Sequence, residues 1–206
     1  MIGTSSIRRT AQIARNYPHL IIRDMRGNID TRLRKLDAND SPFDALILAA
    51  AGLIRVDLRD RISQYLSSDD GAMLYAVGQG AIGIENRSDD VRVKKIMSRI
   101  NHLPTFYATS AERSLLRTIE GGCSAPLGVE TKWSEDGSEL TLRAMLVSVD
   151  GKECAEADIT QTVASTADAD RLGADVAAQI LSRGGDKILD EIKAKRPTLP
   201  IDLEDR

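Results

Sequence analysis

The first third of the chain alternates short apolar segments with segments of helical periodicity. Ile2, residues 20–22 and residues 45–49 are apolar and short, as expected of buried strands. Apolar residues recur at helical spacing after Ser6 and again after Asn28. Because strands that alternate with helices form parallel sheets covered by helices, we expect an α/β domain at the start of the chain.

The rest of the chain predicts a C-terminal α+β domain. Residues 57–72 indicate a short helical or irregular stretch, and residues 73–85 alternate apolar residues with glycines. We expect a three-stranded antiparallel sheet over residues 129–133, 140–149 and 153–162, joined at Asp136-Gly137 and Asp150-Gly151. We expect helices over residues 89–100, 104–119, 169–180 and 188–192.

Arginines gather around the strand-to-helix turns of the first domain. Gly3-Thr4-Ser5-Ser6 precedes Arg8 and Arg9, and Arg26-Gly27-Asn28 precedes Arg32. Arg55 follows the third strand in the same way. Helix N-termini stabilise anions, and turns at the carboxyl ends of parallel strands face one crevice. We interpret these residues as an anion site, with helix capping by Ser5 or Ser6 and solvated arginines as the alternative.

The charge distribution supports a small anionic ligand. Residues 1–66 contain 11 Lys and Arg against 7 Asp and Glu, although the whole chain carries a net charge of -3. Nearly all of these cations are arginines, which grip carboxylate or phosphate bidentately. Aromatic residues make up only 3% of the chain, which leaves little for stacking nucleic-acid bases.

The sequence offers no sign of membrane insertion or export. It has no apolar run long enough to span a bilayer, and its N-terminus does not resemble a secretory signal. We therefore expect a cytoplasmic protein without membrane contact.

The two cysteines differ in their surroundings. Cys123 follows a predicted helix, between Gly121-Gly122 and a proline turn, where a loop can present a nucleophilic thiol. Burial as a small hydrophobic residue is the alternative for Cys123, and it is the expectation for Cys154 in a predicted strand. Two cysteines so far apart in the sequence predict neither a disulfide framework nor a metal site.

The segment Gly78-Gln79-Gly80-Ala81-Ile82-Gly83 has the spacing of a dinucleotide-binding turn. No amphipathic helix is predicted directly after it, so an NAD-linked enzyme is a weak alternative. We interpret the segment as a glycine-rich strand or interdomain crossing, in which Gln79 can hydrogen-bond a ligand.

Together these motifs closely resemble the porphobilinogen deaminase (hydroxymethylbilane synthase) family. The matching segments are residues 3–9, 26–33, 48–55, 77–85 and 121–123, in the family's order. The resemblance implies a periplasmic-binding-protein-like parallel-sheet domain over residues 1–72. It also implies that residues 73–100 are the return segment of a further domain, and that residues 101–206 form the cofactor-attachment domain.

The resemblance also implies a chemistry. Cys123 would carry a dipyrromethane cofactor through a thioether, and the enzyme, a transferase of tetrapyrrole and heme biosynthesis, would add four porphobilinogen units to it with loss of ammonia. The ligand carboxylates would be bound by Ser6, Arg8, Arg9, Arg26, Arg32 and Arg55, with Gln79 beside them. The family implies a monomer at full length.

The chain departs from the family in one respect. The family's first domain supplies a Lys-Asp pair for proton transfer, and no segment of this sequence matches it. We therefore expect a truncated chain with little or no activity by itself. A non-catalytic polycarboxylate-binding module is the alternative function.

Overall fold

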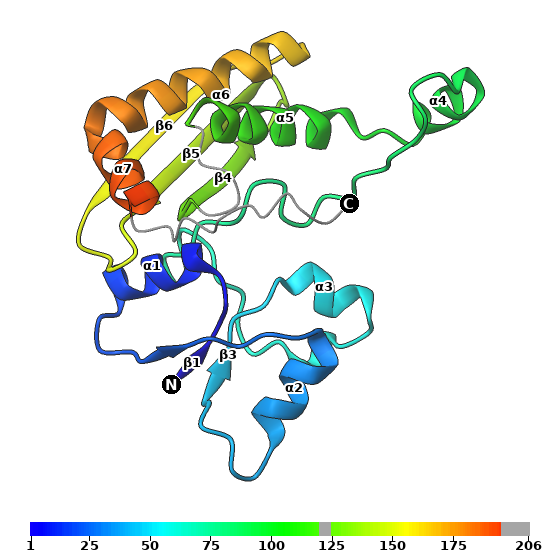
Figure 1. Ribbon diagram of the computed structural model, residues 1–206. Coiled ribbons are helices and arrows are strands. Elements are labelled where there is room, and N and C mark those ends of the chain that lie inside the picture. Colours follow the sequence, from blue (N-terminus) through cyan, green and yellow to red (C-terminus); the bar gives the residue numbers. More distant parts are fainter. Residues whose placement is uncertain (120–124, 195–206) are drawn as a thin grey trace, which may run out of the picture.

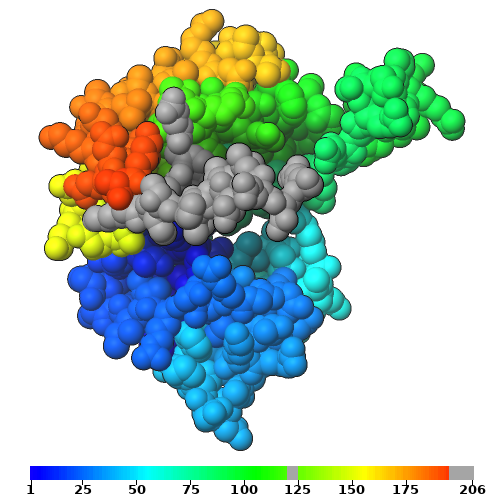
Figure 2. Space-filling view, in the orientation of Figure 1, coloured from blue at the N-terminus to red at the C-terminus, as the bar shows by residue number. Residues whose placement is uncertain are grey.

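The structure, a computed structural model, describes residues 1–119 and 125–194. These residues form two lobes, one N-terminal (blue to cyan) and one C-terminal (green to red), as Figures 1 and 2 show. None of the helices in these two ranges is long and apolar enough to cross a bilayer.

The N-terminal lobe contains the predicted parallel sheet. Its strands are β1 (Ile2–Gly3), β2 (Ile22–Arg23) and β3 (Ala45–Leu46), in the order β2-β1-β3. The intervening helices are α1 (Ile7–Asn16), α2 (Ile29–Asp37) and α3 (Ala50–Arg55). Ile2 lies opposite both Ile22 and Ala45, so β1 is the central strand. The predicted alternation of strands and helices is confirmed.

The C-terminal lobe contains the predicted antiparallel meander. Its strands are β4 (Leu127–Trp133), β5 (Glu139–Val147) and β6 (Cys154–Thr162), in that order. Gly137 (φ 71°) and Gly151 (φ 77°) adopt the left-handed backbone that their hairpin turns require. Both hairpins were predicted from these glycines.

Helices pack on one face of the meander (Figure 1). They are α5 (Leu103–Thr118), α6 (Thr166–Ile180) and α7 (Asp186–Ala194), with a distorted turn at Leu181–Gly185 before α7. Leu115 of α5, Leu172 of α6 and Leu142 of β5 are completely buried in a shared core. This core is the largest in the described residues, and it fixes α5 against β4.

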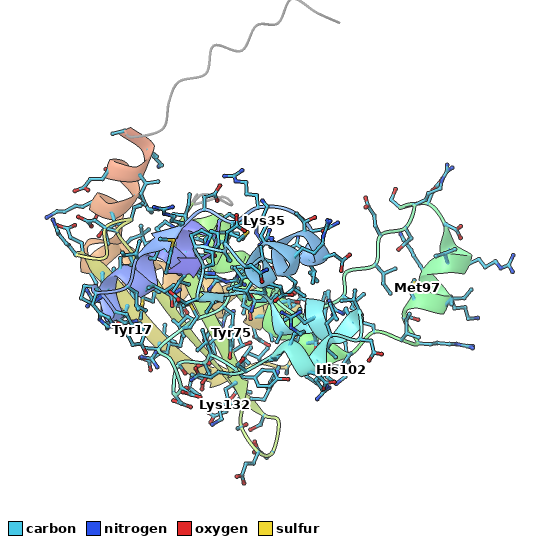
Figure 3. The ribbon with its side chains drawn as sticks, turned by 90° about the horizontal axis from the view of Figure 1, so that it is seen from below. Tyr17, Lys35, Tyr75, Met97, His102 and Lys132 are labelled. Carbon is cyan, nitrogen blue, oxygen red and sulfur yellow. The ribbon has the colours of Figure 1, made fainter. Side chains whose placement is uncertain are left out.

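Residues 56–102 connect the lobes with little regular structure. They contain a short 3-10 helix (Arg59–Arg61) and α4 (Val91–Met97), which is shorter than the helix expected over residues 89–100. Figures 1 and 3 show α4, which carries Met97, standing away from both lobes. Ile82, Val91 and Ile100 in this segment are largely exposed.

Residues 73–80 form a crossing between the lobes. Leu74 is buried against α1, and Tyr75 makes an isolated antiparallel bridge with Val129 of β4 through two hydrogen bonds of 2.8 Å. The glycine-rich segment is therefore a crossing and not an extended strand.

Candidate functional site

The turn between β1 and α1 places two arginines on the first turn of a helix. Ser6 caps α1 by accepting a hydrogen bond from Arg9 N at 3.4 Å. A Cβ at Gly3 would lie 2.5 Å from Leu46 Cδ2 and 3.0 Å from Phe43 Cδ1, so glycine leaves room for these two side chains before the turn. The hydroxyl of Ser6, which the sequence predicts to bind ligand, is engaged in capping the helix.

Arg8 is buried without a carboxylate. Its side chain is 6% exposed, and the guanidinium donates to Leu74 O and, at 3.4 Å, to Gln79 Oε1. Within the described residues it forms no ion pair. Burial, followed by the charge of Arg9, lowers the pKa of Arg8 to about 10. A buried cation whose partners are all neutral favours the arrival of an anion.

Arg9 follows Arg8 on the first turn of α1 and is half-buried. Its Nη1 donates to Ile47 O at 2.5 Å, and no ion pair to it is found in the part of the chain that is described. Burial and the nearby charge of Arg32 lower the pKa of Arg9. Like-charged side chains held this close repel one another unless an anion lies between them.

Arg8 and Arg9 both line a cleft of about 760 Å³ in the N-terminal lobe. Its lining is largely apolar and includes Leu46, Leu53 and Tyr75, together with Gln79, Gly80 and the carboxyl groups of Asp44 and Asp70. A cleft with apolar walls and a few charged donors is typical of a site for an organic anion.

Arg55 forms a hydrogen bond with the crossing between the lobes, residues 73–80. Its Nη2 donates to Gly80 O at 2.6 Å. Gly78 (φ 69°) and Gly80 (φ 90°) adopt left-handed backbone that favours glycine. No helix begins in the described residues that follow Gly83 until Val91, so this segment does not form the strand-turn-helix of a dinucleotide site. The glycines instead shape the crossing around Gln79.

The second predicted turn points its arginines elsewhere. Arg26 pairs with Asp24 at 2.9 Å, and both side chains are largely exposed. Arg32 Nε donates to Gly27 O at 2.7 Å and is close enough to Arg9 to lower its pKa. Neither Arg26 nor Arg32 lines the cleft. The structure thus brings together Arg8, Arg9 and Gln79 in the cleft, links Arg55 to Gly80 without placing it in the cleft lining, leaves Arg32 at the margin and turns Arg26 outward.

Cys123, which the sequence marks for covalent attachment, lies outside the described residues. The other cysteine, Cys154, is half-buried, and its thiol donates to Glu156 Oε1 at 3.3 Å. Burial, and then Glu156, raise the pKa of Cys154 to about 12, which makes it a poor nucleophile. The expected packing role of Cys154 agrees with this environment.

Sequence reasoning did not single out Gln12 and Glu112, which are buried polar residues that hydrogen-bond the crossing at Leu74 and Gly78. Both lie on inner helix faces, Gln12 four residues after Arg8 and Glu112 four residues after buried Ala108. A polar residue at an apolar position of a helix was the available signal. We find no group of His, Cys, Asp and Glu suited to a metal ion in the described ranges.

Comparison with known proteins agrees with this geometry. Residues 1–95 match the family model described as porphobilinogen deaminase, dipyromethane cofactor binding domain. Residues 106–182 match the model described as porphobilinogen deaminase, C-terminal domain.

Curated proteins named porphobilinogen deaminase are similar to almost the whole chain. The Yarrowia lipolytica protein is 50% identical over 192 residues, which are 93% of this chain and 56% of that protein. The Debaryomyces hansenii protein is 46% identical over 97% of this chain and 55% of its own length. The Saccharomyces cerevisiae protein is 46% identical over 95% of this chain and 60% of its own length. The chain therefore spans a little more than half the length of these relatives.

Proposed function

Because the chain belongs to the porphobilinogen deaminase family, we propose that it serves hydroxymethylbilane synthesis. In this proposal it binds a dipyrromethane cofactor through Cys123 and acts on porphobilinogen with loss of ammonia. We also propose the domain division at residues 1–72, 73–100 and 101–206, a periplasmic-binding-protein-like first unit, a cytoplasmic location and a monomeric full-length protein.

One observation carries the binding proposal: buried Arg8 and half-buried Arg9 lie next to each other, and neither has a carboxylate partner among the described residues. Each pyrrole of the cofactor carries an acetate and a propionate, so the ligand brings the anions that these cations lack. The residues present therefore fit the group.

The described residues have different roles in binding the ligand. Arg8, Arg9 and Gln79 hold carboxylates in the cleft that they line, and Arg55 holds one beside Gly80, which its side chain contacts. The apolar walls accept the pyrrole rings and exclude water, which strengthens each charge-assisted hydrogen bond. When bound, the cofactor supplies the pyrrole chain to which porphobilinogen units are added.

The chain contains no segment that matches the Lys-Asp pair of the family. Loss of a positioned general acid or base costs roughly 10² to 10⁴ in rate. We therefore propose that this chain, assayed alone, loads and binds the cofactor but turns over little substrate.

The test is covalent loading. The purified chain is incubated with preuroporphyrinogen, and the peptide that contains Cys123 is examined for a mass increment and for colour with Ehrlich's reagent. Cys123→Ser should abolish loading, whereas Cys154→Ser should preserve it. A Cys123 thiol that stays unmodified in the correctly folded chain would contradict the proposal.

A non-catalytic polycarboxylate-binding module is the second candidate, because the same buried arginines support it. Calorimetry with butanetetracarboxylate tests the anion site that both functions share, and loading at Cys123 separates them. Arg8→Met should weaken binding at least about tenfold in both cases, by removing a buried charge-assisted contact. A pure binder should show no loading at Cys123, and Arg26→Ala serves as the outward-facing control.

A further inference from the structure

Glu112 of α5 is a buried carboxyl group with two donors from different parts of the fold. Its side chain is 7% exposed. Oε2 accepts from Gly78 N at 2.6 Å, and Oε1 accepts from Thr131 Oγ1 of β4 at 3.0 Å. No cation in the described residues pairs with it. Burial raises the pKa of Glu112, and the two hydrogen bonds partly offset this effect.

A buried carboxylate without a cationic partner connects two elements at a large desolvation penalty. A neutral side chain can accept hydrogen bonds with a smaller desolvation penalty. The charge does strengthen and shorten the bond to the Gly78 amide, because charge-assisted hydrogen bonds are roughly twice as strong as neutral ones. The arrangement therefore gains geometric precision at Gly78 at the expense of stability.

Gly78 directly precedes the two residues of the crossing that contact the arginines. Gln79 Oε1 accepts from Arg8 at 3.4 Å, and Gly80 O accepts from Arg55 at 2.6 Å. The other end of the crossing is fixed on the same sheet, where Tyr75 bridges Val129. Glu112 and the Tyr75 bridge thus hold the crossing at two points on the C-terminal lobe.

We propose that Glu112 is a positioning residue for the arginine cleft. Its carboxylate fixes the Gly78 amide, so that Gln79 and Gly80 meet Arg8 and Arg55 in the geometry that receives the ligand carboxylates. The proposal rests on the proposed function, since it names how the C-terminal lobe shapes the binding site of the N-terminal lobe. Glu112 itself does not touch the ligand.

The test compares Glu112→Gln with Ser114→Ala on the same helix. Ser114 is equally buried, but its hydroxyl donates to Asp170 O of α6 at 2.7 Å instead of bonding to the crossing. The readouts are the affinity for butanetetracarboxylate by calorimetry, the thermal midpoint, and hydrogen exchange of residues 76–81.

Glu112→Gln should weaken probe binding about five- to tenfold and speed exchange at Gly78 by a similar factor, with little loss of thermal stability. Ser114→Ala should lower the thermal midpoint and leave the affinity within about twofold. If Glu112→Gln instead changes the midpoint alone, Glu112 is structural and the proposal fails.

Two further results distinguish a failure of the Glu112 proposal from a failure of the proposed function. If Glu112→Gln does not fold, exchange in the parent chain decides, because an unprotected Gly78 amide overturns the proposal and a protected one supports it. If the parent chain does not bind the probe, the proposed function fails, while the exchange difference at Gly78 still tests the role of Glu112.

Discussion

The side chain of Gln12 holds the main chain of Leu74 at both of its polar groups. Leu74 N donates to Gln12 Oε1 at 2.7 Å, and Gln12 Nε2 donates to Leu74 O at 3.2 Å. Both residues are buried, and a Cβ at Gly128 of β4 would lie 2.6 Å from Leu74 Cβ. Helix α1, the crossing and β4 therefore meet with no spare volume, and Gln12 replaces the strand partner that Leu74 lacks.

Replacing Gln12 by Leu should destabilise the protein by about 2–3 kcal/mol. The substitution keeps the volume but leaves Leu74 N buried without an acceptor, whereas Leu74 O keeps its bond from Arg8. Urea denaturation measures the change. Asn16→Ala removes a comparable amide bond to Ala72 O at an exposed site and should cost less than about 0.5 kcal/mol. Equal stability of the Gln12→Leu variant and the parent would refute this account.

Gly173→Ala should separate α5 from α6. A Cβ at Gly173 would overlap Ala111 O and would lie 2.7 Å from Leu115 N, and neither backbone atom can move without shifting its helix. Overpacking of this kind costs about 1–3 kcal/mol. Gly83→Ala is the control, because a Cβ there meets nothing within 4 Å. Thermal unfolding measures the midpoint of each variant. Equal midpoints for Gly173→Ala and Gly83→Ala would contradict the prediction.

Local chemistry explains what the sequence could predict. The hairpin turns at Gly137 and Gly151 follow from residues within the turn, and the cap at Ser6 follows from the residues of one helical turn. The βαβ alternation predicts a parallel sheet because few chain paths connect such elements. Each of these features depends on short stretches of sequence. The hairpins and the parallel sheet were predicted, whereas capping by Ser5 or Ser6 was the alternative to an anion site at that turn.

The sequence could not predict which arginines become buried and which stay exposed, because burial depends on contacts between distant segments. Arg8 and Arg26 occupy similar turns, yet residues 73–80 cover Arg8, whereas Arg26 finds Asp24 two residues away. The role of Glu112 likewise requires Gly78, which lies 34 residues away in the sequence. Tertiary packing decides which of several similar side chains becomes buried.

The carboxyl group of Asp136 should titrate with a pKa of about 2. Hydrogen bonds from Ser134 Oγ at 2.6 Å, and from the amide and hydroxyl of Ser138, stabilise its charged form in the β4–β5 turn. Because the folded pKa is lowered, the stability that Asp136 contributes is present above about pH 3.8 and is lost as the pH falls towards 2.

Carbon-detected NMR titration checks this value in the parent chain and in Ser134→Ala. The variant should raise the pKa of Asp136 towards 3.8, because its largest stabilising contact is removed. Asp150, whose pKa is lowered by Ser148 in the other hairpin, should titrate unchanged. An unshifted Asp136 in the variant would show that Ser134 does not hold its charge.

Cys154 should react slowly with iodoacetamide at pH 8. Its pKa of about 12 leaves little thiolate, so alkylation should be roughly 10² to 10³ times slower than for free cysteine. Mass spectrometry distinguishes the peptide with Cys154 from the one with Cys123. Glu156→Gln should speed the reaction only in part, since burial is the larger cause of the raised pKa. In urea the thiol should react at the free rate, and equally fast alkylation of the folded chain would contradict the packing described for β6.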